Sequence, residues 1–94
     1  MAGDIYLALA DATRRAILDE LAKRDGQSLF EICTRLIMDH GSTSTRQAIT
    51  QHLDVLAAAD LVRVEREGRY RFHYLDTRPL SAITERWPIN EQET

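Results

Sequence analysis

The sequence lacks the features that would place it outside a simple globular fold. It has one cysteine, Cys33, which excludes an intramolecular disulfide framework and is compatible with a reducing compartment. No apolar run reaches roughly 18 residues, the length that a membrane-spanning helix needs. The N-terminus has no basic segment followed by an apolar one, and no repeat or low-complexity stretch is present. We therefore expect a soluble, cytoplasmic protein with no membrane partner.

A positive net charge is also lacking, because the 94 residues carry a formal net charge of −3. This disfavours a protein that binds nucleic acid non-specifically, since such affinity comes from neutralising phosphates. A net charge of −3 still allows a local basic patch that binds DNA, so the positions of the charged residues must be considered. The length fits a single domain, residues 1–94, and 44% hydrophobic residues suffice for one core. A domain this small buries a modest share of its surface, so a dimer interface would add stability.

The first half of the chain contains clear helix signals. Ile5–Ala10 predicts a short helix, and Asp11 or Thr13 can cap a second helix that ends near Gly26. The S-x-x-E sequence Ser28–Glu31 predicts a capping box. The helix that follows it carries an apolar stripe at helical spacing, made of Leu29, Ile32, Cys33, Leu36 and Ile37.

A further helix start lies close behind. The segment Asp39–Thr43 is polar and contains a glycine, which predicts a turn. Ser44–Gln47 predicts a second capping box, and the helix after it buries one face. That face consists of Ile49, Leu53 and Leu56. Two helices with strong start signals and a short turn between them predict a helix-turn-helix at about residues 28–59.

Beyond the helix-turn-helix, apolar residues alternate with polar ones. Val62 and Val64 alternate on one strand, Tyr70–Tyr74 on the next, and Gly68 lies between, which predicts a β-hairpin at about residues 61–75. We expect the aromatic trio in the core rather than as a base-stacking platform: Tyr70, Phe72 and Tyr74. Pro79 opens a last helix at about residues 78–87. The order of elements predicts a mainly α fold with a β-hairpin, a winged helix-turn-helix.

The helix after the turn has an unusual polar face. Opposite its apolar residues lie short or amide side chains: Gln47, Thr50, Gln51 and Asp54. Glutamine can bond adenine, threonine can offer a hydroxyl or touch a thymine methyl, and aspartate can accept from cytosine or sit at the groove edge. The helix start adds groups that can contact phosphate: Thr43, Ser44, Thr45 and Arg46. The Arg46 side chain could contact guanine instead. The alternative is an ordinary exposed polar face with good caps.

The hairpin supplies the basic charge. From Leu61 to Arg78 there are five arginines and three acidic residues, a local net charge of 5 − 3 = +2. We expect three of these arginines, at or near the tip, to contact the DNA backbone or the minor groove: Arg66, Arg69 and Arg71. The alternative is a solvated hairpin with cross-strand Arg–Glu pairs.

Three segments resemble one family of proteins. Ala8–Leu18 (ALADATRRAIL) resembles the "LADPTRRAIL" opening of the ArsR/SmtB family of bacterial transcriptional regulators. Arg46–Leu56 (RQAITQHLDVL) resembles the recognition helix of that family, and Leu61–Tyr70 (LVRVEREGRY) resembles its wing. The resemblance implies a homodimer that binds an inverted-repeat operator, with repression relieved by an effector whose identity the sequence does not give. It implies a dimer interface on the first and last helices, with Ile5, Leu9, Leu80, Ile83 and Trp87 as candidates.

The chain departs from the family at several positions. The Cys-x-Cys of metal-sensing members is reduced to Cys33 alone, and the last helix has no histidine, so we expect no metal site and no cofactor. The usual proline is Ala12, and the glycine that usually follows the recognition helix is Asp60, which predicts a less stable helix end. We expect His52, near the core side of the helix, to orient packing or a phosphate.

The sequence therefore favours a sequence-specific DNA-binding regulator, acting as a dimeric repressor without metal sensing. The alternative is a winged helix used only for protein–protein contacts, which the acidic net charge favours slightly. An enzyme is not indicated, because no nucleophile–base pair, phosphate loop or metal cluster is present.

Overall fold

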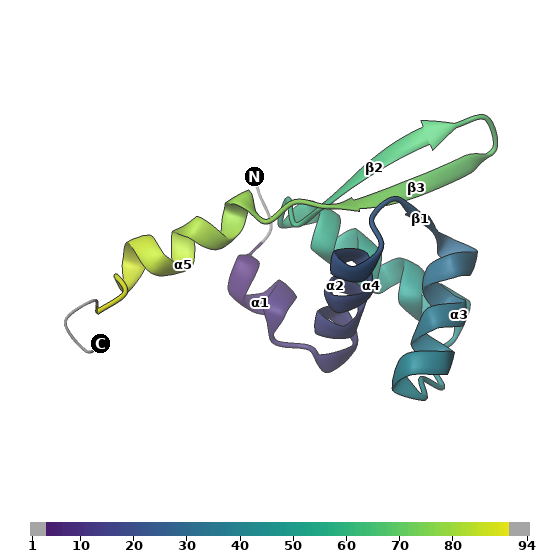
Figure 1. Cartoon of the computed structure of the whole chain (residues 1–94), viewed down its shortest axis with the longest axis horizontal. Helices are drawn as coiled ribbons and strands as arrows, with labels where there is room; N and C mark the ends of the chain where they lie inside the picture. Colours follow the sequence, from purple (N-terminus) through teal and green to yellow (C-terminus); the bar gives the residue numbers. More distant parts are fainter. Residues whose placement is uncertain (1–3, 91–94) are drawn as a thin grey trace.

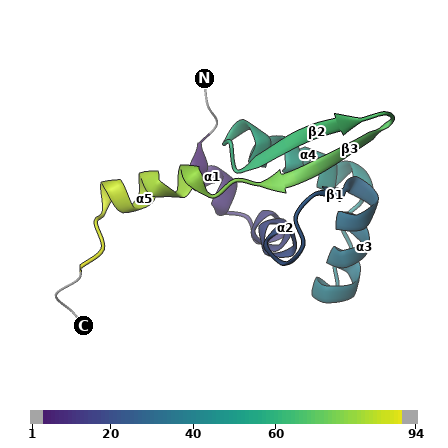
Figure 2. The same cartoon turned by 45° about the horizontal axis from the view of Figure 1, so that its top comes forward.

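The computed structural model describes residues 4–90 and consists of a helical body with a protruding hairpin (Figure 1). The mainly helical fold with a β-hairpin is confirmed, and one short strand, β1, was not predicted. Figure 2 shows the hairpin extending from one end of the body and the last helix from the other. The elements in order are α1 Ile5–Leu9, α2 Ala12–Lys23, β1 Gln27–Ser28, α3 Leu29–His40, α4 Arg46–Ala58, β2 Val62–Glu67, β3 Tyr70–Leu75, the 3-10 helix η1 Arg78–Leu80, and α5 Ser81–Arg86.

Side-chain caps begin the helices of the body. The Asp11 carboxylate accepts from the backbone N–H of Arg14 at 3.0 Å, so Asp11 rather than Thr13 caps α2. The capping box of α3 is confirmed: Ser28 Oγ accepts from Glu31 N at 3.2 Å, and Ser28 N donates to Glu31 Oε1 at 3.0 Å. The Ser28 backbone N–H bonded to Glu31 lowers the pKa of that carboxyl.

The turn before α4 differs from the prediction. Helix α3 continues through His40 and ends at Gly41, where φ is 61°, so the connecting segment is Gly41–Thr45. The predicted capping box Ser44–Gln47 is wrong, because α4 begins one residue later. Thr45 is the cap, and its Oγ1 accepts from Ala48 N at 3.0 Å. Ala48 has no side-chain acceptor to return the bond, so this end has a simple cap.

The end of α4 is closed by a Schellman motif around Asp60. The backbone N–H of Leu61 donates to the Leu56 carbonyl at 3.0 Å, and that of Asp60 donates to the Ala57 carbonyl at 3.0 Å. Asp60 has φ of 60°, and among residues 4–90 it is the one non-glycine residue with positive φ. Leu56 and Leu61 are both fully buried, which supplies the apolar contact of the motif. The left-handed position predicted for Asp60 is therefore confirmed.

The three strands form one antiparallel sheet in the order β1-β3-β2. Val62 pairs with Leu75 and Val64 with His73, so these residues share the face toward the helices. His73 is buried on that face, and its Nδ1 lies 2.9 Å from the Gln27 carbonyl oxygen of β1. The prediction that the aromatic trio is core is wrong, because alternation places it on the opposite face. Tyr70, nearest the tip, is 64% exposed, and Phe72 and Tyr74 are half-buried.

The core lies between the helices and the base of the hairpin. The predicted apolar face of α4 is buried, as are Ile17 and Leu21 of α2. In the predicted stripe of α3, Ile37 is the exception and is 60% exposed, because it lies on the outer side of the helix. The buried apolar residues are Ala8, Ile17, Leu21, Ile32, Leu36, Ile49, Leu53, Leu56, Ala59, Leu61 and Val62.

The last helical segment projects from the body (Figure 1). Instead of one helix over residues 78–87, the chain forms η1, with Pro79 in its first turn, and then α5. No residue of either helix is buried. Trp87 ends α5 and is 58% exposed, with its ring 6.0 Å from the ring of Tyr6 in an edge-on contact. None of the helices within residues 4–90 has the length and apolarity needed to cross a membrane.

Candidate DNA interface

The outward face of α4 presents the predicted polar side chains to solvent. Gln47, Thr50, Gln51 and Asp54 are all exposed, while the opposite face is buried in the core. Thr50 Oγ1 donates to the carbonyl oxygen of Arg46 at 3.0 Å, so its hydrogen is used within the helix. Its oxygen lone pairs and methyl group are left outward. The helix is thus anchored on one side and offers amide, hydroxyl and carboxylate groups on the other.

The start of α4 gathers the other predicted contacts. Thr43, Ser44, Thr45 and Arg46 are all exposed there. The Thr45 hydroxyl oxygen accepts a hydrogen bond from the backbone N–H of Ala48, so this side chain also stabilises the start of the helix. The first backbone N–H groups of a helix have no partner within the helix, which makes this end attractive to an anion.

The wing arginines lie on an exposed hairpin with a two-residue loop, Gly68–Arg69. Gly68 has φ of 61° and no atom within 4 Å of where a Cβ would stand, so backbone conformation alone favours glycine. Arg66 and Arg71 are directly opposite each other in the strand register. Like charges in this position repel, so the tip is arranged unfavourably unless an anion lies against it.

Ion pairing separates the basic residues into two groups. Lys23, Arg24, Arg35, Arg63 and Arg78 each form an ion pair with a carboxylate. Arg14 and Arg15 donate to backbone carbonyls, and Arg86 lies over aromatic rings. Within the described part of the chain, four guanidinium groups have neither an ion pair nor a hydrogen bond: those of Arg46, Arg66, Arg69 and Arg71. All four are on α4 or the wing.

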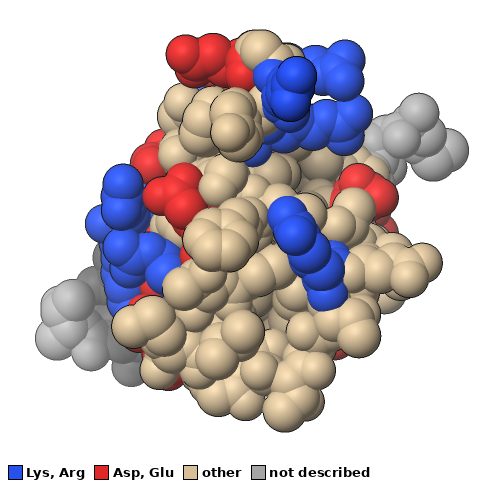
Figure 3. Space-filling model, turned by 90° about the vertical axis from the view of Figure 1, so that its right-hand side faces the viewer, with Lys and Arg blue, Asp and Glu red and all other residues tan. Residues whose placement is uncertain are grey.

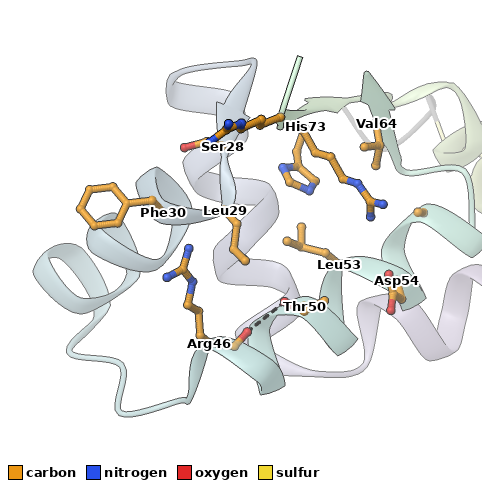
Figure 4. A pocket seen from close by; sticks show the side chains of 12 residues that line it. Ser28, Leu29, Phe30, Arg46, Thr50, Leu53, Asp54, Val64 and His73 are labelled. Carbon is orange, nitrogen blue, oxygen red and sulfur yellow. Dashed lines mark hydrogen bonds between the residues drawn. The ribbon is translucent and has the colours of Figure 1, made fainter. Parts of the chain in front are cut away.

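A hollow of about 300 Å³ lies between α3, α4 and the wing. Arg46, Thr50 and Asp54 line it from α4, and Figure 4 shows Phe30 and His73 on its other sides. Arg69 and Arg71 complete the lining from the wing. In Figure 3 basic side chains gather at the top over the wing, others lie beside acidic side chains at the left edge, and basic atoms also stand in the middle of a largely uncharged surface. The structure thus brings Arg46, Thr50 and Asp54 of α4 and two wing arginines around one concave surface. Three other predicted contact residues do not line it: Gln47, Gln51 and Arg66.

Two residues of this surface were not predicted from the sequence. Phe30, the second residue of α3, is 67% exposed beside the hollow. His73 also lines the hollow and is 6% exposed, with one ring nitrogen 2.9 Å from the β1 carbonyl oxygen of Gln27. The capping box at Ser28 fixes the start of α3, so the sequence does indicate that Phe30 lies in the first turn of this helix. No local signal marks His73, since its position depends on which face of the hairpin turns inward.

A buried carboxylate ties α2 to α3. Glu20 is fully buried, and its Oε2 accepts from Lys23 Nζ at 2.9 Å and lies 3.0 Å from His40 Nε2. Arg35 Nη1 is 3.8 Å from Oε1. Burial raises the pKa of Glu20, but the hydrogen bonds from Lys23 and His40 outweigh it and hold this pKa below its ordinary value. The ionised carboxylate therefore holds the first helix of the helix-turn-helix in place.

The single thiol is in an unreactive setting. Cys33 is half-buried on α3, and burial raises the pKa of its thiol. Within residues 4–90 no group of three or more histidine, cysteine or carboxylate side chains is arranged to hold a metal ion.

Comparison with known proteins agrees with this geometry. A family model described as a helix-turn-helix domain matches residues 9–65. The chain is 45% identical over 83 residues to the HTH-type transcriptional regulator YuzN of Bacillus subtilis (strain 168), covering 88% of this chain and 90% of that protein. It is 30% identical over 74 residues to the HTH-type transcriptional regulator MJ1325 of Methanocaldococcus jannaschii, covering 79% and 76%.

Solved structures show the same relationship. The crystal structure of an ArsR family transcriptional regulator, RHA00566, matches with a TM-score of 0.73 and 26% identity, covering 99% of this chain and 94% of that chain. An ArsR-like transcriptional regulator from Rhodococcus sp. RHA1 matches with a TM-score of 0.73 and 32% identity, covering 87% and 69%. The fold and its exposed helix define a winged helix-turn-helix DNA-binding protein. The chain belongs to the ArsR family of helix-turn-helix transcriptional regulators.

Proposed function

We propose that the protein is a homodimeric repressor that binds an inverted-repeat operator without sensing a metal. In each protomer α4 enters the major groove, and the wing lies against the backbone or the adjacent minor groove. Two protomers related by a twofold axis would present their α4 helices to successive half-sites, which is why the operator would be an inverted repeat.

The observation that carries this proposal is the set of four unpartnered guanidinium groups on α4 and the wing. A solvated hairpin would gain from pairing its arginines with carboxylates, and Arg63 does so with Glu65. Arg66 and Arg71 instead face each other across the strands. Phosphate groups of DNA supply the negative charge that this arrangement lacks, and they do so in a molecule whose net charge is −3.

Base readout would come from the exposed face of α4. The amide of Gln51 can bond the N6 and N7 edge of adenine, and Gln47 offers the same chemistry one turn earlier. Thr50 can accept at its oxygen or contact a thymine methyl, since its hydrogen is already bonded to Arg46. Asp54 borders the hollow beside the wing and can accept from cytosine.

Dimerisation is supported by the unpartnered helices at the end opposite the wing. A six-residue helix with no buried residue is too short to be stable alone in water, so α5 needs a partner. Exposed apolar side chains lie on the same terminal segments, including Leu7 at 58%, Trp87 at 58% and Ile89 at 73%. Of the predicted interface residues, Ile5, Leu9 and Leu80 also pack partly against the core of their own chain.

The absence of metal sensing is proposed from the donor chemistry. Cys33 is the one thiol in the sequence, and among residues 4–90 no group of three or more histidine, cysteine or carboxylate side chains is arranged to hold a metal ion. A titration with zinc or arsenite should therefore leave operator affinity unchanged. A metal-dependent change in affinity would contradict this part of the proposal.

Two substitutions separate base readout from phosphate binding. Gln51→Ala should reduce discrimination between operator and random duplex by roughly fivefold or more, because a bidentate pair with a base is removed. Arg69→Ala should weaken binding to both duplexes and lower the salt slope by about one, because one fewer phosphate is neutralised. Arg78→Ala is the matched control, since Arg78 is bonded to Asp76 at 2.6 Å. Equal effects of the Gln51 and Arg69 variants on both duplexes would contradict this division of roles.

The oligomeric state is tested by sedimentation equilibrium. One chain has a mass of 10.8 kDa, so the dimer should sediment at 2 × 10.8 = 21.6 kDa. Trp87→Ala should shift the equilibrium toward the monomer, because a large aromatic surface is removed from the proposed interface. A wild-type protein that remains at the monomer mass at micromolar concentration would contradict the dimer.

A further inference from the structure

The side chain of Arg14 joins three helices. Its Nε donates to the carbonyl oxygen of Ala8 at 3.0 Å, and its Nη2 donates to that of Leu7 at 2.9 Å. Both carbonyls belong to α1, and carbonyls in the last turn of a helix lack partners within it. The third contact runs to α4, where Arg14 Nη1 lies 3.1 Å from His52 Nδ1. One guanidinium group on α2 therefore holds the end of α1 and the middle of α4.

The chemistry of this contact defines the state of His52. Arginine has donors and no acceptor, so Arg14 donates and His52 Nδ1 accepts. In the neutral ring the hydrogen then lies on Nε2. The nearest carboxylate is that of Asp11, whose Oδ2 is 3.8 Å from the same nitrogen and already accepts from the Arg14 backbone. The arrangement is directional: the guanidinium plane, the α1 carbonyls and the imidazole ring must all be aligned.

The contact is also distinctive for α4. Within residues 4–90, it is the one side-chain hydrogen bond that links α4 to another helix. The rest of the attachment of α4 to the body is apolar packing of Ile49, Leu53 and Leu56. Apolar burial is non-directional, so it resists separation more strongly than it resists a change of angle. A directional bond is what fixes the rotation and tilt of a helix on such a surface.

We propose that Arg14 and His52 are positioning residues that set the angle of α4 relative to α1, and hence the spacing between the two recognition helices of a dimer. This inference rests on the proposed function, in which α1 belongs to the dimer interface. When only one half-site is bound, a change in the angle of α4 can be compensated by a rotation of the whole protein on the DNA. When two half-sites are bound, the two α4 helices are joined through the dimer interface, so a rotation that fits one helix into its groove moves the other out of place.

The inference predicts that removing the bond weakens binding to paired half-sites and leaves a single half-site nearly unaffected. The test uses His52→Leu, which removes the acceptor, and His52→Asn, whose Oδ1 occupies the place of Nδ1 and can accept. The control is Arg15→Ala, since Arg15 Nη1 donates to the α1 carbonyl of Leu9 at 2.8 Å but makes no bond to α4. Affinities are measured on duplexes carrying one half-site or two from a selected operator.

His52→Leu should bind the two-site duplex about tenfold more weakly, the change expected for one hydrogen bond of this kind, and the one-site duplex within about twofold of wild type. His52→Asn and Arg15→Ala should behave as wild type on both. Equal losses on both duplexes, or a His52→Asn variant that folds normally yet fails like His52→Leu, would overturn the inference. Unchanged binding of His52→Leu to the two-site duplex would also overturn it.

A spectroscopic measurement tests the bond itself without DNA. In a long-range proton–nitrogen spectrum of the wild-type protein, the His52 ring should carry its hydrogen on Nε2, with Nδ1 unprotonated. Hydrogen on Nδ1 would overturn the inference whatever the DNA result. A wild-type protein that shows the expected tautomer but has no preference for two half-sites over one would instead refute the proposed inverted-repeat function.

Discussion

Replacing Asp60 by glycine should stabilise the protein. Asp60 stands at the position after α4 where φ is 60°, and its backbone completes the Schellman motif. Within residues 4–90 its carboxylate makes no ion pair or hydrogen bond, so the substitution removes no polar partner of the side chain. Every other residue with positive φ in the described part of the chain is a glycine. The backbone bonds of the motif remain available to glycine, and the gain comes from relieved strain.

The size of the effect follows from two opposing terms. Left-handed backbone costs an L-residue roughly 1–2 kcal/mol, and aspartate tolerates it better than most. Glycine lowers the free energy of unfolding by roughly 0.5–1 kcal/mol, because it makes the unfolded chain more flexible. The net expectation is a stabilisation of about 0.5–1 kcal/mol. For a domain of this size it corresponds to a rise in Tm of roughly 2–8 °C.

Thermal and urea unfolding of three proteins provide the assay. Asp60→Gly should be more stable than wild type, and Asp60→Ala should show no such gain, because alanine keeps the Cβ that causes the strain. The m-value should be the same in all three, which shows that the folded and unfolded states are comparable. An Asp60→Gly protein that is no more stable than wild type would refute the strain argument.

Three further results are expected. Gly41→Ala should lower the free energy of unfolding by about 1 kcal/mol, since φ is 61° and the space is open. Gly26→Ala should cost more, because its Cβ would also stand 2.8 Å from a Tyr74 ring carbon; equal losses in urea unfolding would contradict this. Glu20→Gln should destabilise by about 1–3 kcal/mol at neutral pH. The pKa of Glu20 is lowered in the folded state, so its contribution is present above pH 4.5 and lost as the pH falls through the folded value. The difference in the free energy of unfolding between wild type and Glu20→Gln should therefore narrow in acid. A constant difference across this pH range would show that the ionised carboxylate is not the source of the stabilisation.

Features set by local sequence were predictable. The caps at Asp11 and Ser28 and the left-handed Asp60 each depend on a few neighbouring residues, and the structure confirms them. The start of α4 was misplaced by one residue, because Ser44 and Thr45 are both good caps. The choice between them depends on the preceding turn, in which Ser42 Oγ accepts the Ser44 N–H.

Features set by long-range pairing were not predictable. The alternation of residues in the wing predicts two faces but does not determine which of them is buried. The face with the three aromatic side chains was predicted to be buried, and the opposite face is the one that packs on the helices. The buried His73 depends on β1, a strand of only two residues whose partner lies 46 positions away. The polar face of α4 was predictable as a pattern. The assembly of two of its residues, Thr50 and Asp54, with Phe30 and the wing around one hollow required the tertiary structure.

Sequence-specific binding by a dimer is tested most directly by selecting duplexes from a random-sequence pool with the purified protein. The selected duplexes should carry an inverted repeat, with half-site centres separated by about 10–10.5 base pairs or a multiple of that distance. Gln51→Ala should enrich the same repeat with relaxed preference at one position of each half-site. A pool with no enriched sequence would contradict sequence-specific DNA binding and favour a winged helix that contacts another protein. An enriched site without twofold symmetry would contradict the dimeric arrangement.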